Sequence, residues 1–177
     1  MRRAGPAGFS LIELLVALAV LAVIAAIGVP SWQGLMRDTR LTSTSNEIFT
    51  ALFHARSEAI RRGRRATLCT SADGEWCATG VDWHAGWMLF EDGNDNGRRD
   101  AGETIVAVSG ARSGRLRITG NDPVRNYVSY VPTGMTRTTS GALQMGRFTI
   151  CHGGRGRQIV ISASGRPRVV AGVVCDD

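Results

Sequence analysis

The residues best suited to chemistry in this chain are arginines close to its C-terminus. The segment Gly165-Arg166-Pro167-Arg168 places two guanidinium groups two positions apart. Side chains alternate along an extended chain, so Arg166 and Arg168 are expected to project to the same side. Pro167 cannot donate to a strand ladder, which favours an exposed tip. Since each guanidinium can donate two parallel hydrogen bonds to a phosphate, the spacing predicts a site for a polyanion.

Further arginines extend this pattern. The segment Arg155-Gly156-Arg157 repeats the arrangement in a predicted preceding loop, and Arg147 adds to it. Residues 123–175 contain seven Arg and no acid, whereas residues 73–103 contain eight acids and two Arg. This asymmetry indicates a basic surface with an anionic partner, the alternative being a solvated face enriched in Arg by coding bias. Aromatic residues are few there, which favours contact with a nucleic-acid backbone over stacking on bases.

An acidic loop offers a second candidate site. Residues 92–103 match the calcium-loop pattern D-x-[DN]-x-[DN]-G-x5-E. The potential oxygen ligands are Asp92, Asn94, Asn96 and Glu103. The flanking segments have the pattern of strands, and Asn and Asp beside Gly also suit a long hairpin turn. We therefore expect a turn and no metal or other cofactor, with calcium as the alternative.

Motifs for catalysis are missing from the sequence. It contains no G-x-S-x-G elbow, no H-E-x-x-H and, lacking Lys altogether, no Walker loop. The three histidines, His54, His84 and His152, are isolated from one another in the sequence. We do not expect an enzyme.

The N-terminal segment has the length and composition of a membrane helix. Phe9 to Val29 comprises 21 residues, of which Glu13 alone is charged. At about 1.5 Å per residue such a helix spans roughly the 30 Å hydrocarbon core of a bilayer. Arg2 and Arg3 precede it, so the positive-inside rule places the first residues in the cytoplasm and everything after Pro30 on the other side. A carboxylate inside such a segment indicates a function.

Four cysteines fall on this non-cytoplasmic side, where disulfides persist. We favour Cys69 with Cys77 and Cys151 with Cys175, because each pair brackets one local unit; sequence alone leaves three pairings open. A four-cysteine zinc site would need C-x-x-C spacing, which is absent.

The start of the chain resembles a known signal. A short basic leader ending in Gly8, followed by Phe9, a hydroxyl residue, two aliphatic residues and Glu13, is similar to the class III signal of type IV pilins and type II secretion pseudopilins. The resemblance implies that a prepilin peptidase cuts after Gly8 and methylates Phe9. It also implies that Glu13 neutralises the α-amino group of a neighbouring subunit in a filament. An ordinary secretory signal and a plain membrane anchor are the alternatives.

The rest of the chain resembles the FimT/GspH branch of these proteins. The resemblance lies in residues 68–77, in Gly86-Trp87-Met88-Leu89-Phe90 and in the 92–103 block. The Gly-Arg-x-Arg segment is similar to the DNA-binding motif of FimT minor pilins, which capture DNA during natural transformation. That similarity carries over to Gly165, Arg166 and Arg168.

The elements that must position these residues follow from periodicity. We expect a leader at 1–8, a membrane half-helix at 9–29, an amphipathic half-helix at 30–63 and a β-rich head at 64–177. From Leu35 to Ile60 apolar residues recur every three or four positions, and Gly63 is a plausible C-cap. The predicted strands are 66–70, 86–91, 104–109, 115–119, 127–131, 147–152, 158–162 and 168–174. The class is α+β, a pilin fold with a long helix packed on an antiparallel sheet or sandwich.

Together these patterns predict a minor type IV pilin that enters the inner membrane with its head in the periplasm and then joins a pilus. Its expected partners are prepilin peptidase, other pilin subunits and DNA, bound without sequence preference for uptake. The main alternative is a structural minor pseudopilin of type II secretion, or a priming pilin, that binds no DNA. A calcium-stabilised adhesin-like tip is the third interpretation.

Overall fold

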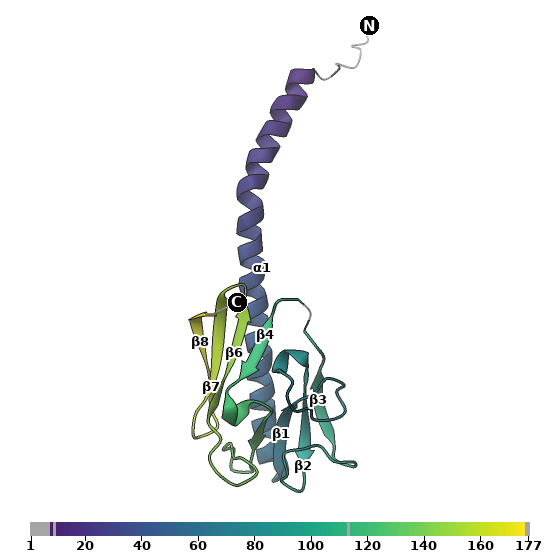
Figure 1. The fold of residues 1–177 in the computed structure, drawn as a ribbon, viewed down its shortest axis with the longest axis vertical. Coiled ribbons are helices and arrows are strands. Elements are labelled where there is room, and N and C mark those ends of the chain that lie inside the picture. Colours follow the sequence, from purple (N-terminus) through teal and green to yellow (C-terminus); the bar gives the residue numbers. More distant parts are fainter. Residues whose placement is uncertain (1–7, 9, 113, 176–177) are drawn as a thin grey trace, which may run out of the picture. The chain divides into compact units, whose positions relative to one another are not determined.

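The computed structural model describes residues 8, 10–112 and 114–175. The predicted methylation site Phe9 lies outside them. Figure 1 shows one long helix followed by a β-rich head, and the contacts divide the chain into two units, Met1–Thr39 and Arg40–Asp177. The two units are described separately below.

The helix α1 (Leu11–Arg62) has clear signals at both ends. At its start, the Ser10 N–H donates to Glu13 Oε2 (3.3 Å) and the Glu13 N–H donates to Ser10 Oγ (3.3 Å), a reciprocal capping box. At its end, Gly63 has φ 63°, the left-handed conformation typical of a residue just past a helix. The C-cap at Gly63 is thus confirmed, and Glu13 has a local role besides the one that the resemblance implies.

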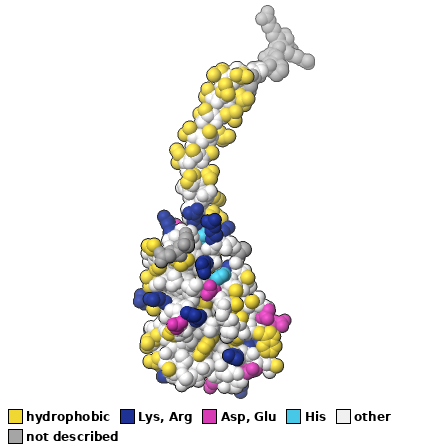
Figure 2. Space-filling model, in the orientation of Figure 1, with side chains coloured by type: hydrophobic (Ala, Val, Ile, Leu, Met, Phe, Trp, Pro, Cys, Tyr) yellow, Lys and Arg dark blue, Asp and Glu magenta, His cyan; other side chains and the backbone are white. Residues whose placement is uncertain are grey.

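In the first unit, α1 is long and apolar enough to cross a membrane. An 18-residue stretch has a mean hydropathy of 2.8 with none of its residues buried. Figure 2 shows hydrophobic side chains covering this part of the helix. Pro30 lies inside α1, and the helix continues through it.

In the second unit, α1 turns one face into the head. Its buried residues recur at three- and four-residue spacings and are Leu41, Thr44, Ser45, Ile48, Ala51, Leu52, Ala55, Glu58 and Ala59. Leu35 and Met36, which the periodicity placed on this stripe, are exposed. The reason is that the globular unit begins only at Arg40.

Among the residues that the structure describes, eight strands form two antiparallel sheets of four. The first has the order β3-β2-β1-β5 and the second β4-β6-β7-β8. The strands are β1 (Arg65–Thr70), β2 (Trp87–Asp92), β3 (Ile105–Ser109), β4 (Arg117–Gly120), β5 (Tyr127–Tyr130), β6 (Gly146–His152), β7 (Arg155–Ile161) and β8 (Pro167–Val174), with short 3-10 helices η1 (Trp83–Ala85) and η2 (Asp122–Val124). The α+β class is confirmed, and of the two predicted arrangements the structure has the two-sheet one.

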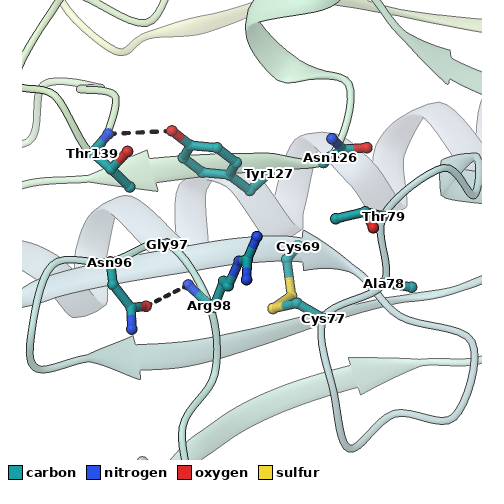
Figure 3. Close-up of a pocket in the computed structure, with 10 residues that line it drawn as sticks. All are labelled: Cys69, Cys77, Ala78, Thr79, Asn96, Gly97, Arg98, Asn126, Tyr127 and Thr139. Atoms are coloured by element: carbon teal, nitrogen blue, oxygen red, sulfur yellow. Dashed lines mark hydrogen bonds between the residues drawn. A yellow bond between two sulfur atoms is a disulfide. The ribbon is translucent and has the colours of Figure 1, made fainter.

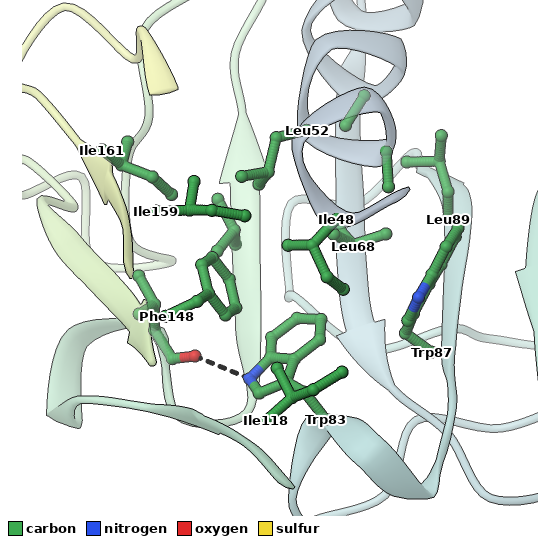
Figure 4. Packing of buried hydrophobic residues seen from close by; sticks show 14 of the residues in the cluster. Ile48, Leu52, Leu68, Trp83, Trp87, Leu89, Ile118, Phe148, Ile159 and Ile161 are labelled. Carbon is green, nitrogen blue, oxygen red and sulfur yellow. Dashed lines mark hydrogen bonds between the residues drawn. The ribbon is translucent and has the colours of Figure 1, made fainter. Parts of the chain in front are cut away.

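The core lies between α1 and the inner faces of both sheets (Figure 4). Ile48 and Leu52 of the helix are fully buried in it. Trp83 packs edge-on against Phe148, with ring centroids 4.9 Å apart. The Trp83 indole N–H donates to the carbonyl of Val124 (3.0 Å), so this large side chain buries no unpaired polar atom.

The prediction for the start of β7 was wrong. Arg155 and Arg157, expected in a loop, belong to β7, which begins three residues earlier than predicted. Gly153 and Gly154 have φ of 59° and 74°. Two residues with positive φ allow a two-residue hairpin turn, so β6 and β7 pair up to His152 and Arg155.

Candidate nucleic-acid interface

The turn that carries Arg166 is fixed by its backbone. The Gly165 N–H donates to the Ser162 carbonyl (2.9 Å), and the Ser162 N–H donates to the Arg166 carbonyl (3.1 Å). Gly165 has φ +74°, and a Cβ there would lie 2.6 Å from the carbonyl oxygen of Gly134. Only glycine fits both constraints. The turn is therefore seated against the segment that follows β5.

A buried tyrosine holds the turn from below. The Tyr130 hydroxyl is buried and donates to the Gly165 carbonyl (3.0 Å). Burial raises the pKa of Tyr130 well above its usual range, so the hydroxyl keeps its proton and remains a donor. Gly165 and Pro167 are buried, whereas Arg166 and Arg168 are exposed. The buried residues of this segment anchor it, and the arginines project outward.

Strand register places Arg147 and Arg168 on one face. Arg147 on β6 pairs with Val160 on β7, which in turn pairs with Arg168 on β8. Directly opposite residues project to the same side of a sheet, and two strand spacings are about 10 Å. The neighbouring pair Phe148 and Ile159 is fully buried, so this row faces away from the core. We call Arg147, Arg166 and Arg168 the basic face.

The basic face has no acidic partner in the part of the chain that the structure describes. None of its three arginines forms an ion pair with a described residue. Arginines elsewhere do, including Arg65 with Asp95 (2.9 Å) and Arg112 with Glu47. The guanidiniums of the basic face are thus available to an external anion.

Arg155 and Arg157 do not join the basic face. Arg155 lies at the β6–β7 hairpin, six residues from the other end of β7, about 20 Å away at strand rise. Arg157 pairs with Ile150, which is fully buried, so it lies on the opposite side of the sheet from Arg168. The structure thus separates Arg155 and Arg157 from the other predicted residues, which are Arg147, Gly165, Arg166 and Arg168.

The loop at 92–103 is closed by its own hydrogen bonds. Asp92 accepts the backbone N–H groups of Asn96 (3.0 Å) and Gly97 (2.9 Å) and the Thr67 hydroxyl (2.9 Å). Burial raises the pKa of Asp92. Asn94 and Asn96 direct their amide nitrogens to Asp100 Oδ2 (both 2.7 Å). These are the contacts of a hairpin turn.

The last calcium candidate, Glu103, makes contacts of the same kind. It accepts the N–H groups of Gly93 (2.8 Å) and Asp100 (2.9 Å). Over the described residues, no group of three or more His, Cys, Asp or Glu side chains gathers as a metal site would require. The oxygens predicted as cation ligands are acceptors for the turn itself.

Both predicted disulfides are present. Cys69 is bonded to Cys77 and Cys151 to Cys175. The second bond joins β6 to the end of β8 and passes over β7 at Gly156, where a Cβ would lie 2.5 Å from the Cys175 sulfur. Gly156, predicted to separate two phosphate-binding arginines, instead makes room for this disulfide.

Two of the cavities in the head lie outside the basic face and have arginines in their lining. One, of about 370 Å³, lies beside the Cys69–Cys77 disulfide, where Arg98 extends toward the Tyr127 ring (Figure 3). The other, of about 530 Å³, is lined by His84, Arg115 and Arg117. Sequence reasoning missed this second group, although Arg115-Leu116-Arg117 has the Arg-x-Arg spacing of the C-terminal segment.

Comparison with known families gives two matches. Residues 44–165 match the model of the type II transport protein GspH, and residues 3–29 match the prokaryotic N-terminal methylation motif. The pilin-like protein PilA1 of Thermus thermophilus is 28% identical over 165 residues, which are 92% of this chain and 97% of PilA1.

A solved minor pilin has a similar fold, and a solved minor pseudopilin aligns less well. The type IV minor pilin FimU of Pseudomonas aeruginosa aligns with a TM-score of 0.55 and 21% identity, over 78% of this chain and 92% of FimU. The minor pseudopilin EpsH from the type 2 secretion system of Vibrio cholerae aligns with a TM-score of 0.48 and 11% identity, over 74% of this chain and 96% of EpsH. The likeness to FimU confirms the predicted pilin fold.

Proposed function

This chain belongs to the GspH family of type IV minor pilins and type II secretion pseudopilins, and on that premise we propose that it is a minor pilin whose head binds DNA. The binding serves DNA uptake in natural transformation and is independent of base sequence. The observation that carries the proposal is the basic face. Arg147 and Arg168 project from one side of the second sheet, Arg166 is exposed in the turn that precedes β8, and none of the three has a carboxylate partner among the described residues.

The chemistry of the basic face fits a phosphodiester backbone. Guanidinium groups donate bidentate hydrogen bonds to phosphate, and they keep their charge at any physiological pH. The described residues of the face include no aromatic side chain on which a base could stack, since Val160 lies between Arg147 and Arg168. Contacts of this kind position a nucleic acid without reading its sequence.

The N-terminal region supports the assembly part of the proposal. The methylation motif covers the predicted cleavage site after Gly8 and the modified residue Phe9. We propose that prepilin peptidase processes the chain there. The helix then anchors it in the inner membrane with the head in the periplasm until it joins other subunits in a pilus, and Glu13 pairs with the α-amino group of a neighbouring subunit.

A DNA-binding assay over a salt series tests the proposal. We expect the full chain in neutral detergent to bind duplex DNA of unrelated sequences with similar affinity. Replacing two phosphate contacts, Arg166→Gln with Arg168→Gln, should flatten the slope of log K against log salt by about 1.8. Arg64→Gln with Arg98→Gln is the matched control, because it removes the same charge at exposed positions beside the acidic loop.

The main alternative is a structural minor pseudopilin without DNA binding, which the family match itself favours. The same assay separates the two functions. If the wild-type chain does not bind DNA, or if the Arg166/Arg168 variant keeps the wild-type affinity and salt slope, the structural role replaces the DNA-binding one.

A further inference from the structure

A second cluster of cationic side chains lies beside the free edge of β4. A cavity of about 530 Å³ opens there, between η1 and the start of the strand, and His84, Arg115 and Arg117 line it. Arg115 and Arg117 are exposed and form no ion pair with a described residue. Asp82 is the carboxylate in the lining, and it faces His84 at 3.9 Å. Two guanidiniums against one carboxylate leave the cavity cationic.

This cavity opens on the same side of the sheet as the basic face. Arg117 pairs with Cys151 on β6, which lies four residues from Arg147 on the same strand. An even separation along a strand keeps both side chains on one face. Arg117, Arg147 and Arg168 therefore share the outer surface of the second sheet, at two ends of it.

The surface between the two ends is polar and uncharged. Thr119, Thr149 and Gln158 form the row that crosses β4, β6 and β7 there. The Gln158 amide donates to the Thr149 hydroxyl (3.3 Å), and all three side chains are half-buried. No carboxylate of a described strand residue interrupts the path from the basic face to the cavity.

The separation of the two ends follows from strand geometry. Four residues along β6 correspond to about 14 Å, and three strand spacings from β4 to β8 to about 14 Å, which gives a diagonal of roughly 20 Å. A strand with the rise of duplex DNA, about 3.4 Å per nucleotide, covers that distance in roughly six nucleotides. One strand can thus contact both ends.

We propose that the cavity is a second phosphodiester site, at which Arg115 and Arg117 bind the DNA backbone about six nucleotides from the phosphates held by Arg166 and Arg168. The inference rests on the proposed function and extends it. The footprint is the whole outer face of the second sheet, and His84 forms one wall of the second site.

The test uses the full chain in neutral detergent and labelled single-stranded oligothymidylates of 4 and 20 nucleotides. For the 20-mer, Arg115→Gln with Arg117→Gln removes two contacts, so the salt slope falls by about 1.4 and the rise in Kd between 50 and 200 mM salt shrinks about sevenfold. For the 4-mer, which cannot reach both ends, Kd changes by less than about twofold. Arg115→Lys with Arg117→Lys keeps the charges and retains the wild-type slope, which separates charge loss from misfolding.

The possible outcomes distinguish failure of the second site from failure of the proposed DNA-binding function. If the 20-mer binds the Gln variant with the wild-type affinity and slope while the Arg166/Arg168 variant is weakened, the second site is overturned and the proposed function stands. If the wild-type protein binds no DNA, both the second site and the proposed function are overturned. If the Gln variant keeps DNA binding but loses retention on vesicles of anionic phospholipid, the cavity belongs to lipid headgroups, and the inference is overturned.

Discussion

At the scale of single residues, the exposed arginines depend on buried neighbours that carry no charge. Arg166 projects from a turn whose position is set by Gly165 and by the hydroxyl of Tyr130. A guanidinium on a rigid backbone contributes more to binding affinity than one on a flexible loop, because ordering the loop on binding costs conformational entropy. Substitutions at the residues that anchor the turn should therefore change the free energy of unfolding.

Tyr130→Phe should lower the free energy of unfolding by about 1–3 kcal/mol, because it leaves the buried Gly165 carbonyl without its donor. Denaturant unfolding monitored by circular dichroism measures this loss. Tyr127→Phe is the matched control: its hydroxyl accepts an N–H from exposed Thr139. Equal destabilisation by the two substitutions would contradict the role assigned to Tyr130.

Gly156→Ala should impair the Cys151–Cys175 disulfide, because the added methyl would lie 2.5 Å from the Cys175 sulfur and 2.9 Å from the Ile150 carbonyl oxygen. We expect free thiols on alkylation and mass spectrometry and a lower melting temperature. Gly110→Ala is the control, since a Cβ there meets no atom within 4 Å. A fully oxidised Gly156→Ala protein with wild-type melting would show that the crossing has more room than the structure indicates.

At the scale of elements, periodicity and turn chemistry predicted most of the strands, and the exceptions have physical reasons. Strand β7 begins at Arg155 because Gly153 and Gly154 form a two-residue turn, which composition alone did not separate from a longer loop. The buried stripe of α1 begins at Leu41, because the globular unit starts only at Arg40. A pattern of apolar residues along the sequence does not reveal that starting point.

The candidate site was predicted in part. Arg166 and Arg168 were identified from their spacing. This was possible because a strand that starts directly after a glycine turn can be recognised from neighbouring residues alone. Grouping Arg157 with them was wrong, because its side of the sheet is set by pairing with Ile150 across the hairpin. The side of the sheet on which Arg117 lies depends on its register with Cys151, which is a contact between distant segments.

The 92–103 loop should be indifferent to calcium. Asp92 and Glu103 already accept backbone N–H groups, and binding a cation would require those hydrogen bonds to be given up. We expect the melting temperature in excess calcium to match that in a chelator within about 1 °C, since binding to the folded state alone would raise it. A calcium-dependent rise that disappears in Glu103→Gln would reinstate the metal site.

At the scale of the whole molecule, one carboxylate combines an observed contact at the helix start with the assembly role that we propose for it. Glu13 closes the capping box with Ser10 and lies in an otherwise apolar segment. We expect Glu13→Gln to leave the chain in the membrane fraction but to lower its share in sheared filaments, measured by immunoblot. Ser10→Ala is the control that removes the cap partner and keeps the carboxylate. An equal loss in both variants would assign Glu13 to helix capping alone.

The disulfide that passes over Gly156 has a mechanical consequence. A load applied at Arg166 and Arg168 pulls on the first residues of β8, and an edge strand under such a load detaches from its neighbour one hydrogen bond at a time. The covalent link from Cys175 to Cys151 lies at the far end of the same strand. Detachment of β8 can therefore advance only as far as the Cys151–Cys175 disulfide, which thermal motion does not break. When the load is removed, β8 can pair with β7 again.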